Sequence, residues 1–137
     1  MKDLNALIIS LQDLFANRLK SVFIFGSRAN TELQGKVDNV DLFIVLDIVR
    51  SDDLTKLFPY TQKWCAKGNP APVIMGKDEF LGMTDVLAME YSDLKWNYQL
   101  MYGEDVVEQI NVNYFDLRLQ CERELKNLIL RLREFYL

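Results

Sequence analysis

Two short runs of apolar residues constrain the fold of this 137-residue chain most strongly. They span residues 21–25 and 42–46, and both are rich in β-branched and aromatic side chains. Neither run alternates between apolar and polar residues, and both are too short to be helices. Each therefore predicts an inner strand that is covered on both faces. Strands of this kind need flanking layers, which indicates an α/β protein.

The rest of the chain supplies these layers. Helical spacing of apolar residues and capping residues predict helices over residues 3–19, 51–66 and about 114–136. Turn signals bound two further predicted strands, at 72–75 and 94–102. The segment 77–93 is predicted to form a short helix and turns. We therefore expect a single domain over residues 1–137. Its fold class is α/β (α+β), with a small mixed β-sheet flanked by helices and a long C-terminal helix.

Composition narrows the range of functions. The chain contains no histidine, which excludes His-based triads, His general bases and zinc sites with imidazole ligands. Its net charge of −4 argues against nucleic acid as a partner, because phosphate binding needs clustered Lys and Arg. The chain has no apolar run of about 18 residues and no signal-peptide pattern. We expect a cytoplasmic protein that does not engage a membrane, with Cys65 and Cys121 as reduced thiols.

A Gly26-Ser27 pair directly follows the first predicted strand. Glycine allows a ligand to approach the backbone, and a serine hydroxyl with the amides of a following helix can hold phosphate oxygens. Any strand-to-helix turn can also carry these two residues, so the pair alone leaves both interpretations open. The segment is not a Walker A loop.

Asn39-Val40-Asp41 leads directly into the second predicted strand. Residues 39 and 41 project to the same side of an extended chain. Two carboxylates in this arrangement bind divalent metals that carry a triphosphate and activate an attacking hydroxyl. Here the first of the two positions is an amide.

Together these motifs resemble the nucleotidyltransferase superfamily, the DNA polymerase β-like fold. Gly26-Ser27-Arg28-Ala29 is similar to that family's GSRA turn, and residues 37–45 are similar to its SDxDL strand. The resemblance implies that Gly26, Ser27 and Arg28 bind the nucleotide. It also implies that Asp41 and Asn39 occupy the catalytic and metal positions, with Mg²⁺ as cofactor and a nucleoside triphosphate as ligand. The segment that begins at Tyr102-Gly103-Glu104-Asp105 also resembles bacterial members of the superfamily.

The chain departs from the family pattern where the family needs acids. Asn39 replaces the first aspartate, and the strand predicted at 72–75 lacks a carboxylate. Asp38, Asp78 and Glu79 lie close in the sequence to these positions and are the alternative carboxylate ligands for a metal. We expect either an impaired transferase that moves a nucleoside monophosphate to a hydroxyl acceptor, or a non-catalytic nucleotide- or protein-binding module, antitoxin-like or regulatory.

The last predicted helix carries more apolar residues than one stripe needs. A stripe at Leu117, Cys121, Leu125, Leu128, Leu132 and Phe135 is widened by Ile129, and Leu119, Leu130 and Leu137 lie away from it. This surplus predicts a homodimer or a helical protein partner, unless loops cover it. The aromatic residues Trp64, Trp96, Tyr91 and Tyr98 are expected in the core and at its edge rather than in a base-stacking surface.

Overall fold

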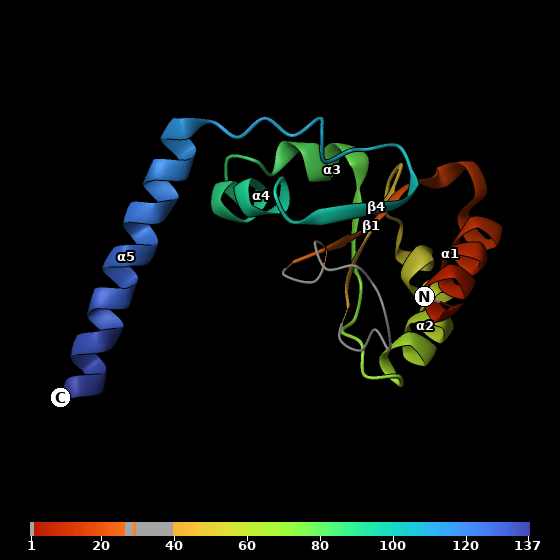
Figure 1. Cartoon of the computed structure of the whole chain (residues 1–137), viewed down its shortest axis with the longest axis horizontal. Helices are drawn as coiled ribbons and strands as arrows, with labels where there is room; N and C mark the ends of the chain where they lie inside the picture. The colour runs from red at the N-terminus through yellow and green to blue at the C-terminus, as the bar shows by residue number, and fades with distance from the viewer. Residues whose placement is uncertain (1, 27–28, 30–39) are drawn as a thin grey trace.

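The computed structural model describes residues 2–26, 29 and 40–137, which form a four-stranded sheet with helices on both faces (Figure 1). In chain order the elements are α1 (Lys2–Phe15), the 3-10 turn η1 (Ala16–Arg18), β1 (Leu19–Phe25), β2 (Asp41–Leu46), α2 (Ser51–Cys65), β3 (Val73–Gly76), α3 (Lys77–Gly82), α4 (Ala88–Leu94), β4 (Tyr98–Gly103) and α5 (Tyr114–Tyr136). The flanked sheet and the long C-terminal helix confirm the predicted fold class.

The sheet is mixed, with the strand order β3-β2-β1-β4. β1 is antiparallel to both of its neighbours, whereas β2 and β3 are parallel. The register pairs Phe25 with Asp41 and also with Tyr98. The end of β1, the start of β2 and the start of β4 therefore meet at one edge of the sheet.

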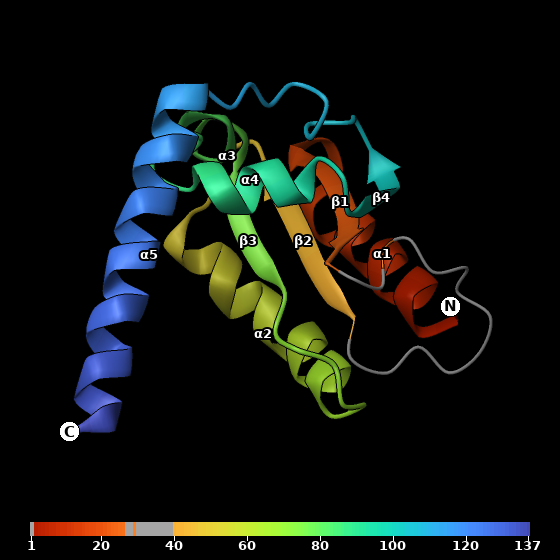
Figure 2. The ribbon, with the colours of Figure 1, turned by 60° about the vertical axis from the view of Figure 1, so that its left-hand side comes forward.

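Each face of the sheet carries its own hydrophobic core, and Figure 2 shows the two helical layers on opposite sides. α1 and α2 cover the face formed by Val22, Ile24, Leu42, Ile44 and Leu46. α3 and α4 cover the face formed by Phe23, Phe43 and Val45. Because strand side chains alternate between faces, residues 22–25 of β1 and 42–46 of β2 are apolar at every position. This arrangement accounts for the two uninterrupted apolar runs in the sequence.

Two predicted boundaries were wrong. The first helix ends at Phe15 rather than near residue 19, because η1 turns the chain and β1 begins at Leu19. The strand predicted at 94–102 begins at residue 98, because residues 88–94 form α4. Tyr91 and Leu94 are three residues apart on α4, and both are buried against the α3/α4 face of the sheet. Helical spacing was thus present in a segment that also has strand-forming residues.

A buried ion pair joins the start of α2 to the end of η1. Both terminal nitrogens of Arg18 donate to the carboxylate of Asp53, at 2.8 and 2.7 Å, and Asp53 is fully buried. The amide of Arg50 donates to the same carboxylate at 2.9 Å, so Asp53 also caps α2. Its hydrogen bonds with Arg18 are the main cause that lowers the pKa of Asp53 to about 2.

This ion pair predicts a loss of stability in acid. The folded-state pKa of Asp53 lies below its ordinary value of 3.8, so its contribution is present above about pH 4 and is lost as the pH falls toward 2. We expect the urea midpoint to fall over this window, and to fall less in Asp53→Asn, which is already destabilised at pH 7. Asp52→Asn removes an exposed carboxylate paired with Lys56 and is the matched control. An unchanged pH dependence in Asp53→Asn would contradict the assignment.

Candidate functional site

Gly26 ends β1 in a conformation that favours glycine. Its φ is +85°, in the left-handed region. A side-chain carbon placed on Gly26 would lie 3.3 Å from the Oδ2 atom of Asp41. The absence of a side chain at residue 26 thus allows the Asp41 carboxylate to lie directly beside the backbone of the turn. The amide of Ala29 donates to the Gly26 carbonyl at 3.0 Å, and Ala29 is buried in the α1/α2 core.

Asp41 is the first residue of β2, and its side chain is exposed. Alternation along the strand places it on the same face as Phe43 and Val45, which is the face covered by α3 and α4. The ring of Phe25, its partner across the strands, packs against Phe43 with ring centroids 5.8 Å apart. The carboxylate therefore stands at the rim of the apolar core, free to contact a ligand.

Two asparagines hold the backbone on either side of Gly26 and Asp41, and no sequence motif marks either of them. The amide of Gly26 donates to the carbonyl of Asn97 at 3.0 Å, which continues the β1–β4 ladder past its last strand pair. The amide of Val40 donates to the buried side chain of Asn69 at 3.2 Å. Both contacts join residues far apart in the chain, so no local pattern could reveal them.

Among the described residues of β1, β2 and β3 that face this side of the sheet, Asp41 is the one carboxylate. The β3 residues on the same face as Asp41 are Val73 and Met75, both apolar. Asp78 and Glu79 follow Gly76, which pairs with Leu46 at the opposite end of β2, roughly 16 Å from Asp41 at the usual strand rise. Glu79 is instead the cap of α3 and accepts from the amide of Gly76 at 3.1 Å. Completion of the site by Asp78 or Glu79 is therefore wrong, and residues 2–26, 29 and 40–137 hold no cluster of three acidic or cysteine ligands.

The remaining predicted site residues, Ser27, Arg28 and Asn39, lie outside the described residues, as does the alternative ligand Asp38. Gly26 and Asp41 are the two members of the predicted site that the structure places, and it brings them together. The nucleotide-binding and metal-binding roles of all five site residues stay predictions.

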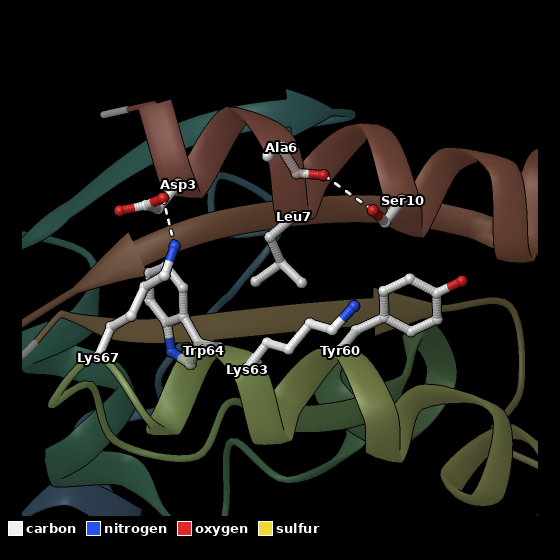
Figure 3. A pocket seen from close by; sticks show the side chains of 8 residues that line it. All are labelled: Asp3, Ala6, Leu7, Ser10, Tyr60, Lys63, Trp64 and Lys67. Carbon is white, nitrogen blue, oxygen red and sulfur yellow. Dashed lines mark hydrogen bonds and ion pairs between the residues drawn. The ribbon is translucent and has the colours of Figure 1, made fainter.

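A separate groove lies between α1 and α2, and Figure 3 shows its lining. It has a volume of about 250 Å³ and is lined by Asp3, Ala6, Leu7, Ser10, Tyr60, Lys63, Trp64 and Lys67. Lys67 pairs with Asp3 across the groove, so this contact ties the two helices together. α1 and α2 cover the face of the sheet opposite to the one onto which Asp41 projects, and Asp41 is not among the residues that line the groove.

α5 extends away from the rest of the domain (Figures 1 and 2). It is anchored near its start by Gln120, whose side chain accepts from the amide of Met89 and donates to Glu90, both at 2.8 Å. From Glu122 onward every residue of α5 is exposed, including Leu125, Leu128, Ile129, Leu132, Phe135 and Tyr136.

A search of the described residues finds no helix with the length and apolar character of a membrane span.

The sequence matches no protein-family model and no curated protein. Solved structures do match. Spectinomycin adenyltransferase AAD(9) from Enterococcus faecialis, with ATP and spectinomycin, superposes with a TM-score of 0.58 at 17% identity over 93% of this chain. A toxin–antitoxin structure with AMP-PNP superposes with a TM-score of 0.50 at 15% identity, over 93% of this chain and 97% of that chain. A Shewanella oneidensis structure of tri-AMPylated HEPN toxin in complex with MNT antitoxin superposes with a TM-score of 0.51 at 11% identity, over 93% of this chain and 96% of that chain.

These likenesses show that the chain has the fold of the nucleotidyltransferase superfamily, as the two sequence motifs predicted. At such identities they establish the fold alone. This chain spans 66% of the length of the adenyltransferase, just under two thirds.

Proposed function

We propose that the domain binds a nucleoside triphosphate at the edge formed by Gly26 and Asp41, and that its capacity for nucleotidyl transfer is weak. The observation that carries this proposal is the approach of the Asp41 carboxylate to the side-chain-free Gly26, at the end of β1 in a nucleotidyltransferase fold. The structural neighbours include an adenyltransferase with ATP and a complex with AMP-PNP, which supports a nucleotide as the ligand class.

Each predicted site residue has a chemical role in this proposal. The Ser27 hydroxyl and the Arg28 guanidinium hold phosphate oxygens, and the glycine keeps the turn open to them. Asp41 is the anionic ligand, and Asn39 would contribute a neutral amide oxygen. The reaction class is transfer of a nucleoside monophosphate from the triphosphate to a hydroxyl of an acceptor.

Magnesium fits this set of ligands poorly. When bound, it would neutralise the triphosphate, but in-line transfer at phosphorus uses two metal ions held by several carboxylates. Asp41 offers one carboxylate, Asn39 brings no charge, and the β3 residues on the same face of the sheet, Val73 and Met75, are apolar. We therefore propose weak magnesium binding and very low turnover.

Restoring the missing acid tests this proposal. Asn39→Asp is expected to tighten binding of the magnesium–nucleotide complex on the order of tenfold, because a second carboxylate joins Asp41. Asp41→Asn should remove magnesium-dependent binding in both backgrounds. Calorimetric titration with ATP in the presence and absence of magnesium measures both effects.

An assay of nucleotidyl transfer gives the result that would contradict this proposal. Transfer of labelled nucleotide to the chain itself, or to mixed cellular acceptors, is measured with magnesium or manganese. Robust transfer by the wild type that is lost in Asp41→Ala would overturn the impaired-enzyme proposal and establish an active transferase.

α5 supports a second candidate function, that of a protein-binding module. Exposed apolar residues recur along this helix from Leu125 to Tyr136, which is a common property of interface helices. Of the two partners predicted from the sequence, a helical protein and a second copy, we propose the second copy, because the charges along α5 complement those of an antiparallel copy. The toxin–antitoxin neighbours show the same fold in complexes with another protein.

A further inference from the structure

The groove between α1 and α2 has the size of a small-molecule site (Figure 3). Its volume of about 250 Å³ exceeds the roughly 150 Å³ of a protein cavity that binds benzene, so it has room for one ring with a short acidic group. Each helix presents one face to the groove, because the lining residues recur at helical spacing. They are Asp3, Ala6, Leu7 and Ser10 from α1, and Tyr60, Lys63, Trp64 and Lys67 from α2 and the turn after it.

The walls of the groove are apolar and aromatic. Leu7 and Trp64 are 7% and 5% exposed, and the half-buried Tyr60 packs against the same α1/α2 core. The indole N–H of Trp64 donates to a backbone carbonyl of the turn after α2 at 2.9 Å, so its ring atoms are what it offers to the groove. The Ser10 hydroxyl donates its one proton to the carbonyl of Ala6 at 2.9 Å. The walls therefore suit a flat apolar body, and neither Trp64 nor Ser10 has a proton left for an anion.

Lys63 supplies the charge of the groove. Lys67 is paired with Asp3, whereas Lys63 forms no ion pair or hydrogen bond with any other described residue. Figure 3 shows its amine within the groove, between the side chains of Leu7 and Tyr60. Two lysines and one acid give the lining a net positive charge, within a chain of net charge −4. One unpaired cation beside apolar walls complements a single carboxylate, and Asp3 opposes a more highly charged anion such as a phosphate.

We propose that this groove is a binding site for a small aromatic monocarboxylate. The ring packs against Leu7 and Trp64, where aromatic contact adds to the effect of burial, and the carboxylate accepts hydrogen bonds from the amine of Lys63. The ligand contacts both helices, so binding holds α1 against α2 and stabilises the folded state. This inference is independent of the proposed nucleotide site, because no residue that lines the groove belongs to that site.

The fluorescence of Trp64 measures binding, because the chain contains only Trp64 and Trp96. Trp96 is 81% exposed, contrary to the sequence-based expectation that it lies in or beside the core, and it does not line the groove. In Trp96→Phe the emission therefore reports on the groove alone. Benzoate is expected to change this emission with a dissociation constant on the order of 1 mM, a value typical of so small a ligand. Benzylamine has the same ring and the opposite charge, and it should have no effect.

Variants of the two helices complete the test. Lys63→Gln is expected to weaken benzoate binding at least about tenfold, whereas Lys63→Arg keeps the charge and should retain most of the affinity. Lys56→Gln is the matched control, because Lys56 lies on the same helix, pairs with Asp52 and does not line the groove. Ala6→Phe fills the groove from an exposed position on α1 and should abolish binding.

The urea midpoint provides a second readout, because a ligand that binds the folded state raises it. Saturating benzoate should raise the midpoint of the wild type and leave that of Ala6→Phe unchanged. Wild-type affinity in Lys63→Gln or in Ala6→Phe would show that benzoate binds elsewhere, and equal responses to benzoate and benzylamine would show that charge plays no part. Either result would overturn the proposal, as would an unchanged emission and midpoint at about ten times the expected dissociation constant.

Discussion

Gly103→Ala is expected to remove at least about 3 kcal/mol from the free energy of unfolding, a large share of the stability of a domain of this size. Gly103 ends β4 at a φ of +84°, and a side-chain carbon there would lie 2.0 Å from the carbonyl oxygen of Lys20. The same oxygen accepts the amide of Glu104 at 2.9 Å. Backbone atoms of β1 occupy the space, so alanine fits only if the β1–β4 ladder opens at this end.

Gly68→Ala is the matched control for this prediction. Gly68 has nearly the same conformation, with a φ of +87°, but no atom lies within 4 Å of the added carbon. It carries only the cost of the left-handed conformation, roughly 1 kcal/mol. Urea unfolding of the wild type, Gly103→Ala and Gly68→Ala separates the steric cost from the conformational cost. Equal destabilisation by the two substitutions would show that β4 does not pack on β1 as described.

The central strands could be predicted from the sequence because both of their faces are buried. Residues 22–25 and 42–46 leave no polar position, and runs of that length are too short for a typical helix. The segment 77–93 was predicted only as a short helix and turns, and it forms both α3 and most of α4, whose Tyr91 and Leu94 pack in one core with Phe80. Short elements whose residues suit both structures depend on tertiary contacts.

The candidate site could be predicted only where its members follow strand ends. Gly26 and Asp41 were found because each stands next to an apolar run, and antiparallel pairing brings the two together. Asn69 and Asn97 hold the backbone through contacts with residues 29 and 71 positions earlier in the chain, and no motif marks such contacts. The exclusion of Asp78 and Glu79 needed the β2–β3 register, which the sequence does not contain.

Self-association through α5 is expected at tens of micromolar protein, and Leu128→Glu should weaken it by at least about a hundredfold. In a twofold dimer each substitution counts twice, and each leucine contributes about 2 kcal/mol when it is buried. Leu125, Leu128 and Leu132 follow the alternating spacing of three and four residues that seats one helix against another. All three are more than half exposed, so they are available to a partner.

The charges along α5 favour an antiparallel pair. Glu124 and Arg131 each precede a leucine of the stripe, Leu125 and Leu132, so both flank the same side of it. With Leu125 of one copy against Leu128 of the other, Glu124 faces Arg131 of the second copy, and the twofold axis repeats the contact. A parallel pair would not bring these opposite charges together. Arg131 makes no ion pair with any other described residue, whereas Glu124 lies 4.0 Å from Arg123.

Charge reversal distinguishes this pairing from other modes of association. Glu124→Arg alone and Arg131→Glu alone should each weaken the dimer about fivefold, since each turns two attractive contacts into repulsive ones. The double variant restores opposite charges and should recover the wild-type dissociation constant. Sedimentation equilibrium measures all of these, with Leu54→Glu as the control for an exposed leucine on α2. A wild-type chain that stays monomeric would exclude the second copy. A dimer that the double variant fails to restore would exclude the antiparallel register, because only that register brings residues 124 and 131 of different copies together.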